Sequence, residues 1–171
     1  DTDRLPEEKK RGMSIDLGFA YQEIENGKTL GFVDVPGHEK FITNMLAGVT
    51  SVDYAMLIIA ADDGPMLQTI EHLAILDLLG ISEGIIVLSK IDRVEEGRLK
   101  EVKDEIEDML IGTCLETSDI FPVSAITGDG VQDIRDHLEA MSELLSETDP
   151  QGNFRLAIDR CFTVPGAGVV V

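Results

Sequence analysis

The sequence lacks tryptophan, has two cysteines and contains few basic residues. Cys114 and Cys161 lie far apart, with no CxxC pair and no clustered histidines, which disfavours a disulfide framework or a zinc site. A reducing compartment is therefore expected, and we predict a cytoplasmic location. Acidic residues number 33 against 14 basic ones, and such a surface repels phosphate backbones on average. Contact with nucleic acid is expected to be local or to be made by other domains.

Long apolar segments are also absent. The longest uninterrupted apolar run, Ala55–Ala61, is far shorter than the roughly 20 residues that a helix needs to cross a bilayer. No cationic stretch leads into an apolar one at the N-terminus, so no signal peptide is visible. Hydrophobic residues nevertheless make up 43% of the 171 residues, too many for a disordered chain. The sequence therefore predicts a folded core and no membrane partner.

Apolar and amphipathic segments alternate along most of the chain. A polar stretch over residues 1–13 is expected to form a loop, and a hairpin is predicted next, because Asn26-Gly27 favours a tight turn between strands over 15–24 and 29–35. Further strands are predicted over 54–61, 84–89 and 120–123, and helices over 39–48, 67–79, 95–110 and 131–145. Apolar strands alternating with helices indicate an α/β fold. We expect a mostly parallel sheet with helices on both faces and one antiparallel edge hairpin.

Three polar clusters follow these strands, at the carboxyl ends where an open parallel sheet binds its ligands. The first cluster is Asp34-Val35-Pro36-Gly37-His38. The carboxylate of Asp34 has the chemistry to hold a Mg²⁺-bound water, and Gly37 lets its N–H approach a phosphate oxygen. His38 could orient or polarise a water. The same residues also fit a strand followed by a Pro-Gly turn and a helix start.

The second and third clusters suit a nucleobase. In Ser89-Lys90-Ile91-Asp92, the Asp92 carboxylate could accept from both N1–H and the exocyclic amine of guanine, a pair of donors that adenine lacks. The stem of Lys90 could lie over the base plane. Asp92 could equally cap the following helix, or the cluster could make a surface ion pair. The third cluster, Ser124-Ala125, could line the base with backbone groups or be only a strand-to-loop junction.

The three clusters in this order are stronger evidence for a function than any one of them alone. A DxxG element, then [ST]KxD, then Ser-Ala, each at the end of a strand, is the layout of a GTPase domain. The chance of all three occurring in this order is small. We therefore predict a GTPase domain of the P-loop-NTPase type.

Longer stretches of the sequence carry a family resemblance. They include residues 1–8, Arg11-Gly12-Met13-Ser14-Ile15-Asp16-Leu17-Gly18-Phe19-Ala20-Tyr21, residues 31–41, residues 72–80 and residues 154–160. These stretches resemble the selenocysteine-specific elongation factors, which are translational GTPases, and the similarity covers essentially the whole chain. Val35 and Ser89 stand where the elongation factor Tu family usually has Cys and Asn, which favours the selenocysteine-specific factors.

This resemblance implies a role for each residue of the three clusters. Ser14 and Asp34 would hold Mg²⁺, Gly37 would sense the γ-phosphate of GTP, and His38 would position the attacking water. The guanine pocket would be formed by Ser89, Lys90, Asp92, Ser124 and Ala125. The implied cofactors are GTP or GDP and Mg²⁺, and the implied partners are selenocysteinyl-tRNA and the ribosome. The protein would deliver this tRNA to recoded UGA codons and hydrolyse GTP after docking.

One GTPase element does not occur in the sequence, which contains no G-x-x-x-x-G-K-[ST] phosphate loop. In the family this loop and the first strand come before the position of Asp1, so we expect a piece of a longer chain that is inactive alone. The GTPase domain is expected over residues 1–148, a linker over 149–153, and the first strands of a β-barrel domain over 154–171. Recognition of the selenocysteine-insertion mRNA hairpin would belong to further C-terminal domains.

Two other functions remain open at this point. The chain could belong to another tRNA-carrying GTPase, such as an elongation factor Tu relative or an initiation factor γ subunit. The aminoacyl ester that the full-length protein protects from hydrolysis would distinguish these. The chain could also be a non-enzymatic, acidic α/β interaction module.

Overall fold

The computed structural model describes residues 2, 6–11, 14–24, 27–49, 52–144, 161–166 and 168–170. The elements up to the first long helix are α1 (Pro6–Arg11), β1 (Gly18–Glu23), β2 (Thr29–Asp34), a 3-10 turn η1 (Glu39–Phe41) and α2 (Ile42–Val49). They are followed by β3 (Ala55–Ala60), α3 (Leu67–Leu79), β4 (Gly84–Ser89), a second 3-10 turn η2 (Ile91–Arg93) and α4 (Glu96–Leu110). The last elements are β5 (Ile120–Pro122), α5 (Val131–Leu144), β6 (Phe162–Val164) and β7 (Gly168–Val170).

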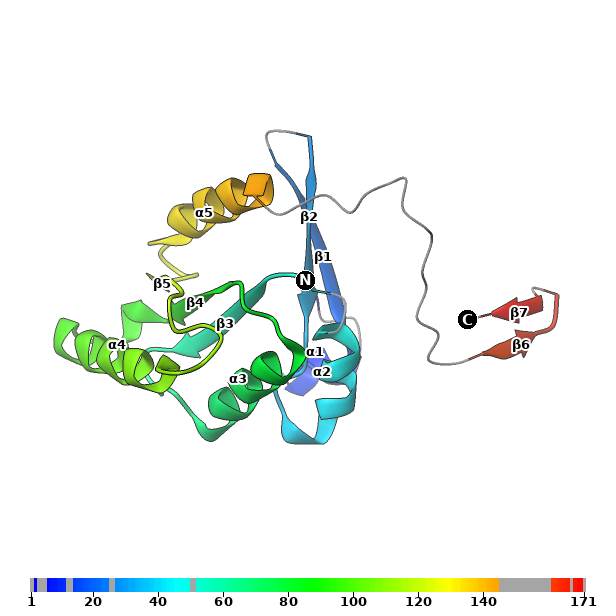
Figure 1. The fold of residues 1–171 in the computed structure, drawn as a ribbon, viewed down its shortest axis with the longest axis horizontal. Coiled ribbons are helices and arrows are strands. Elements are labelled where there is room, and N and C mark those ends of the chain that lie inside the picture. Colours follow the sequence, from blue (N-terminus) through cyan, green and yellow to red (C-terminus); the bar gives the residue numbers. More distant parts are fainter. Residues whose placement is uncertain are drawn as a thin grey trace.

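Strands β3, β4 and β5 form a parallel sheet in that order. Its central strand β4 alternates between two apolar layers, because successive side chains of a strand point to opposite faces. Ile86 and Leu88 pack in a cluster with residues of α3 and α4, whereas Ile85 and Val87 pack toward α5. Figure 1 shows α3 and α4 on one side of this sheet and α5 on the other. The expectation of a parallel sheet covered on both faces is therefore confirmed.

The N-terminal polar segment differs from the expected loop, because residues 6–11 form helix α1. Pro6 occupies the first helical position, where its fixed φ suits a helix, and the acidic Glu7 and Glu8 favour the positive N-terminal end. Glu8 is buried, and its Oε1 accepts from the backbone N–H of Ile15 and of Asp16, both at 3.0 Å. The following segment is thereby tied to α1.

The hairpin also differs from the expectation. β1 and β2 pair in antiparallel register from Gly18↔Asp34 to Glu23↔Thr29, but they form a sheet of their own instead of an edge of the parallel sheet. The hairpin instead packs against α2, where Gly48 allows a close approach. A β-carbon on Gly48 would lie 2.6 Å from the Leu17 side chain and 2.9 Å from that of Val35. Side-chain packing, which the strand pattern does not encode, thus replaces the expected edge pairing.

Three remaining expectations concern the turn, the cysteines and the C-terminal region. Asn26 of the predicted turn lies outside the described residues, but Ile24 N–H donates to Lys28 O over 3.0 Å and Gly27 has φ of 77°. Cys114 and Cys161 are free cysteines in this structure. The expected linker at 149–153 lies outside the described residues, and β6 pairs with β7 in an antiparallel hairpin. None of the described helices combines the length and apolar character that crossing a membrane requires.

Candidate functional site

The [ST]KxD segment and the Ser-Ala pair meet at one edge of the parallel sheet. β4 and β5 run in parallel register from Ile86↔Ile120 to Leu88↔Pro122, so both strands end at the same edge. Val123 N–H donates to Leu88 O over 2.8 Å, and Ile91 N–H donates to Val123 O over 3.3 Å. Backbone hydrogen bonds thus join the loop after β4 to the loop after β5.

A short hydrogen bond links the candidate base-binding residues of these two loops. Ser124 Oγ donates to Asp92 Oδ1 over 2.6 Å. Ser124 is fully buried, whereas Asp92 is exposed, so the Asp92 carboxylate is held at one oxygen while its residue stays open to solvent. The interpretation of Asp92 as a helix cap is wrong, because the N-cap position of α4 is Glu95 and Asp92 lies within η2. Ala125 is exposed and follows Ser124 directly.

The buried hydroxyl of Ser124 organises its own loop as well. Its Oγ accepts from the N–H of Ile126 at 3.3 Å and of Thr127 at 3.2 Å. We expect Ser124→Ala to destabilise this loop by about 1–3 kcal/mol, because it removes a bond to a carboxylate and leaves two amides without this acceptor. Hydrogen exchange at those two amides should then rise about five- to 150-fold in the full-length protein.

The matched control for this prediction is Ser118→Ala. Ser118 is half-buried in the loop before β5, and its replacement should change exchange at residues 126 and 127 by less than about twofold. Equal exchange in the Ser124→Ala variant and in the control would show that the Ser124 hydroxyl does not hold the loop.

Ser89 and Lys90 lie at the end of β4, beside the end of β3. Ser89 Oγ donates to Ile59 O over 3.3 Å, so its hydroxyl fastens β4 to the neighbouring strand. The Lys90 ammonium lies 3.1 Å from Asp62 Oδ1 and 3.7 Å from Asp63 Oδ2. The hydrogen bond from Lys90 lowers the pKa of Asp62. A surface ion pair, which the sequence analysis gave as an alternative for this cluster, is therefore present at Lys90. Its partners, Asp62 and Asp63, were not predicted from the sequence.

The DxxG cluster follows β2. Asp34 pairs with Gly18 across the hairpin, and its Oδ2 accepts from the hydroxyl of Thr2 over 2.5 Å, a contact that sequence reasoning missed. His38 is the N-cap of η1, and its Nδ1 accepts from Lys40 N–H over 3.2 Å. A neutral imidazole that accepts at Nδ1 carries its proton at Nε2, so the ring can donate from that nitrogen.

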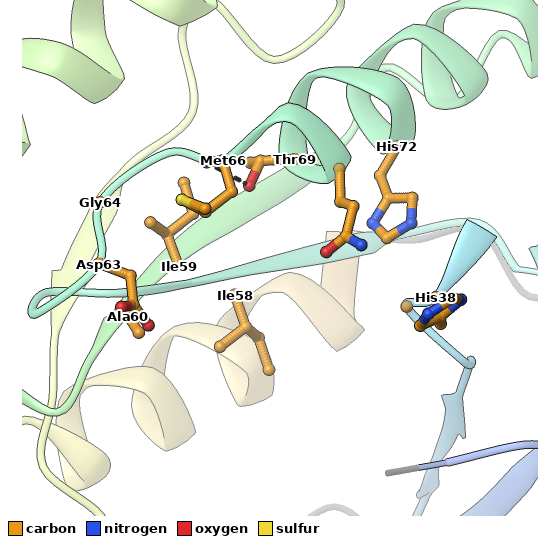
Figure 2. A pocket seen from close by; sticks show the side chains of 11 residues that line it. His38, Ile58, Ile59, Ala60, Asp63, Gly64, Met66, Thr69 and His72 are labelled. Atoms are coloured by element: carbon orange, nitrogen blue, oxygen red, sulfur yellow. Dashed lines mark hydrogen bonds between the residues drawn. The ribbon is translucent and has the colours of Figure 1, made fainter.

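A hollow of about 310 Å³ opens next to this cluster. Gly37 and His38 line it together with residues of β3, of the loop after β3 and of α3. In Figure 2, His38 and His72 lie toward one end of the hollow and Asp63 toward the other. His72 is half-buried, burial lowers its pKa, and a β-carbon on Gly37 would lie 3.7 Å from His72 Cε1. Sequence reasoning missed His72, although Thr69 and His72 are spaced to share a face of the predicted helix.

Ser14 lies in the segment between α1 and β1. It is half-buried, and the neighbouring Ile15 O accepts from Asn44 Nδ2 of α2 over 3.0 Å. The hairpin register places Ser14 four residues before Gly18, the partner of Asp34. Ser14 therefore precedes the strand end at which Asp34 pairs. Among the described residues, no three His, Cys, Asp or Glu side chains converge as a metal site.

Comparison with known proteins places this geometry in a family. Residues 1–147 match the family described as the elongation factor Tu GTP binding domain. Over 171 residues the chain is 51% identical to the selenocysteine-specific elongation factor of Escherichia coli (strain K12), covering all of this chain and 28% of that protein.

Solved structures agree with this match. The chain resembles a crystal structure of the bacterial selenocysteine-specific elongation factor EF-Sec with a TM-score of 0.86 and 40% identity, over 99% of this chain and 29% of that chain. Its similarity to the translation elongation factor SelB from Methanococcus maripaludis, solved in complex with the GTP analogue GppNHp, has a TM-score of 0.79 and 29% identity. That match covers 91% of this chain and 34% of the other.

The chain thus spans only about 28% of the length of the Escherichia coli relative. The resemblance to selenocysteine-specific elongation factors that the sequence predicted is confirmed by the identity over the whole chain. Because the family match covers residues 1–147 and the fold is shared with solved relatives, the chain belongs to the elongation factor Tu GTP-binding domain family of translational GTPases.

Proposed function

We propose that the full-length protein carrying this chain is a GTPase that delivers selenocysteinyl-tRNA to the ribosome at recoded UGA codons. Binding of a guanine nucleotide is supported by the hydrogen bond from buried Ser124 to exposed Asp92, at the edge of the sheet where the strands end. The 51% identity to a selenocysteine-specific elongation factor supports the choice of tRNA. The 171 residues contain no G-x-x-x-x-G-K-[ST] loop, so each experiment below uses the full-length protein.

Guanine recognition follows from the acceptor chemistry of Asp92. An ionised carboxylate only accepts, and guanine presents two adjacent donors, N1–H and the exocyclic amine. The Ser124 hydroxyl fixes the carboxylate orientation from the buried side, over 2.6 Å. We assign Lys90 to cover the base plane with its stem, Ala125 to line the base with its backbone, and Ser89 to anchor the loop through Ile59 O.

The residues assigned to Mg²⁺ are Ser14 and Asp34, and their chemistry fits the ion. Mg²⁺ prefers oxygen ligands and usually keeps several waters and phosphate oxygens, so one or two protein groups suffice. Asp34 Oδ2 accepts a hydrogen bond from the Thr2 hydroxyl, and a metal-bound water would donate a hydrogen bond to this carboxylate in the same way. When bound, Mg²⁺ would neutralise charge on the phosphate oxygens. Gly37 is exposed, and its N–H is assigned to the γ-phosphate.

His38 is the residue assigned to the hydrolysis step. Its backbone position is fixed by η1 and its Nδ1 is occupied by Lys40 N–H, so Nε2 is the nitrogen available to a water. Phosphoryl transfer depends mainly on positioning and on electrostatic stabilisation, and little covalent chemistry is required of the protein. Holding the attacking water in line with the γ-phosphate is therefore a sufficient role for one imidazole.

The proposed tRNA specificity predicts which aminoacyl ester the protein protects. With GTP and protein at about ten times the dissociation constant, spontaneous hydrolysis of selenocysteinyl-tRNA should slow about tenfold, because only the free fraction hydrolyses. The same tRNA charged with serine is the matched control and should lose its ester at nearly the unprotected rate. Equal protection of both esters would contradict selenocysteine specificity, and protection of alanyl-tRNA(Ala) would favour a relative of elongation factor Tu.

A further inference from the structure

Lys90 has an unusual backbone for a residue with a side chain. Its φ of 59° and ψ of 34° lie in the left-handed region, and it is the one non-glycine residue with positive φ in the described part of the chain. A β-carbon disfavours this conformation, which persists only where surrounding contacts hold it in place. The contacts of Lys90 therefore show what maintains the turn that carries Asp92.

Asp62 supplies those contacts from the neighbouring strand. β3 and β4 run in register up to Ala60↔Ser89, and Ala61 N–H donates to Ser89 O over 2.8 Å, so the loops after both strands begin side by side. Lys90 Nζ lies 3.1 Å from Asp62 Oδ1 and 3.4 Å from Oδ2. Arg93 Nη1 lies 3.4 Å from the same Oδ2. One carboxylate thus pairs with the residues at both ends of the segment 90–93.

The segment 90–93 is consequently held from two sides. Asp62 pairs with its cations, while Ser124 donates to Asp92 and Val123 O accepts from Ile91 N–H. Within the segment, Arg93 N–H donates to Lys90 O over 3.0 Å. Asp92 therefore lies between the two residues that pair with Asp62, within a segment that is held at both ends.

We propose that Asp62 is a positioning residue for base recognition, holding Lys90 and Asp92 in the geometry that retains a bound guanine nucleotide. This inference rests on the proposed function for the identity of the ligand. The claim that Asp62 holds segment 90–93 in place does not depend on that function. Asp62 touches no base in this account and acts through Lys90 and Arg93. Its loss should therefore speed nucleotide release and leave the choice of base unchanged, because Asp92 remains.

Asp63 provides a matched control. It is the adjacent residue with the same side chain, but its only ion pair among the described residues is a 3.7 Å contact to Lys90, and its side chain is 64% exposed. Asp62 is 30% exposed and makes two ion pairs. A general effect of negative charge near the site would be equal in both variants, whereas a positioning effect would be larger at Asp62, which makes the shorter contact to Lys90 and also pairs with Arg93.

The test measures release of fluorescently labelled GDP from the full-length protein by stopped flow. Asp62→Asn should release GDP about three- to tenfold faster, the range expected for losing two partly exposed ion pairs, with association changed less than about twofold. Asp62→Glu should restore most of the slow release, and Asp63→Asn should speed release by less than about twofold, because it loses a single exposed contact of 3.7 Å. Because ion pairs are screened by salt, the difference between wild type and Asp62→Asn should shrink at 1 M KCl.

Hydrogen exchange in the nucleotide-free protein tests the structural role of Asp62 separately from nucleotide binding. Asp62→Asn should raise exchange at the Ile91 and Arg93 amides by a factor similar to that in the release rate. If Asp62→Asn exchanges faster than wild type but the wild-type protein does not bind GDP, the proposed function is contradicted. The structural role of Asp62 in ordering segment 90–93 is then still supported. Unchanged exchange and unchanged release in a protein that binds GDP would overturn the role of Asp62 alone, as would equal effects of Asp62→Asn and Asp63→Asn.

Discussion

Asp92→Asn is expected to lower the affinity of the full-length protein for GDP by about two to four orders of magnitude and to create a preference for xanthosine diphosphate. Guanine loses two hydrogen bonds to a charged acceptor, each worth roughly 1.5–3 kcal/mol. Xanthine carries a carbonyl oxygen where guanine has its exocyclic amine, and the amide of asparagine can donate to that oxygen. The Ser124 hydroxyl that now donates to Asp92 can still donate to the amide oxygen.

The gain of xanthine binding makes this prediction independent of folding defects, because a misfolded site would bind neither base. Asp129→Asn is the matched control, since Asp129 lies in the loop after β5 and its side chain accepts from Thr127 Oγ1 over 2.7 Å. Its replacement should change GDP affinity less than about threefold. Competition titrations with both diphosphates measure the preference, and an unaltered guanine preference in Asp92→Asn would remove Asp92 from the base pocket.

His38→Ala is expected to reduce ribosome-stimulated GTP hydrolysis about a hundred- to a thousandfold while GTP affinity changes less than about twofold. The imidazole is assigned to hold the attacking water in line with the γ-phosphate, and the loss of such positioning costs a factor of about a hundred or more. GTP binding is retained because the base contacts lie after β4 and β5, and because the Gly37 N–H assigned to the γ-phosphate is a backbone group that this substitution leaves in place. Single-turnover hydrolysis with programmed ribosomes and an equilibrium binding titration measure the two quantities separately.

Glu39→Ala is the control for this variant. Glu39 is the neighbouring residue, opens η1 and is exposed, so its loss tests whether disturbing this turn is enough to slow hydrolysis. Its stimulated rate should stay within about twofold of wild type. An unchanged stimulated rate in His38→Ala would refute the role of His38, and an equal loss in Glu39→Ala would assign the effect to the turn.

The parts of the fold that the sequence predicted best have a continuous apolar run or a clear stop signal at their ends. Gly84–Ser89 and Leu67–Leu79 are found with the expected ends, because a buried parallel strand is apolar throughout and α3 is closed by Gly80 in the left-handed conformation. The meeting of Asp92 and Ser124 was also predictable, since the carboxyl ends of adjacent parallel strands lie at one edge.

The features that sequence reasoning missed depend on contacts between side chains of distant loops. Asp62 pairs with Lys90 and Thr2 donates to Asp34, but neither pair leaves a periodic signal in the chain. The choice between Asp92 as a helix cap and as a base contact likewise required the structure, because it depends on where α4 begins. The N-cap position of that helix is Glu95, three residues after Asp92, and Asp92 therefore lies in the turn that contacts Ser124.

The central claim is that the loops after β2, β4 and β5 form a site for a guanine nucleotide. It is tested most directly by titrating the full-length protein with fluorescent GDP and Mg²⁺ and displacing the label with unlabelled GDP or ADP. The account predicts displacement by GDP, with ADP needing roughly a hundredfold or more higher concentration, because adenine offers no donor pair to Asp92. Displacement by ADP at the same concentration as GDP, or no binding of labelled GDP by the full-length protein, would contradict it.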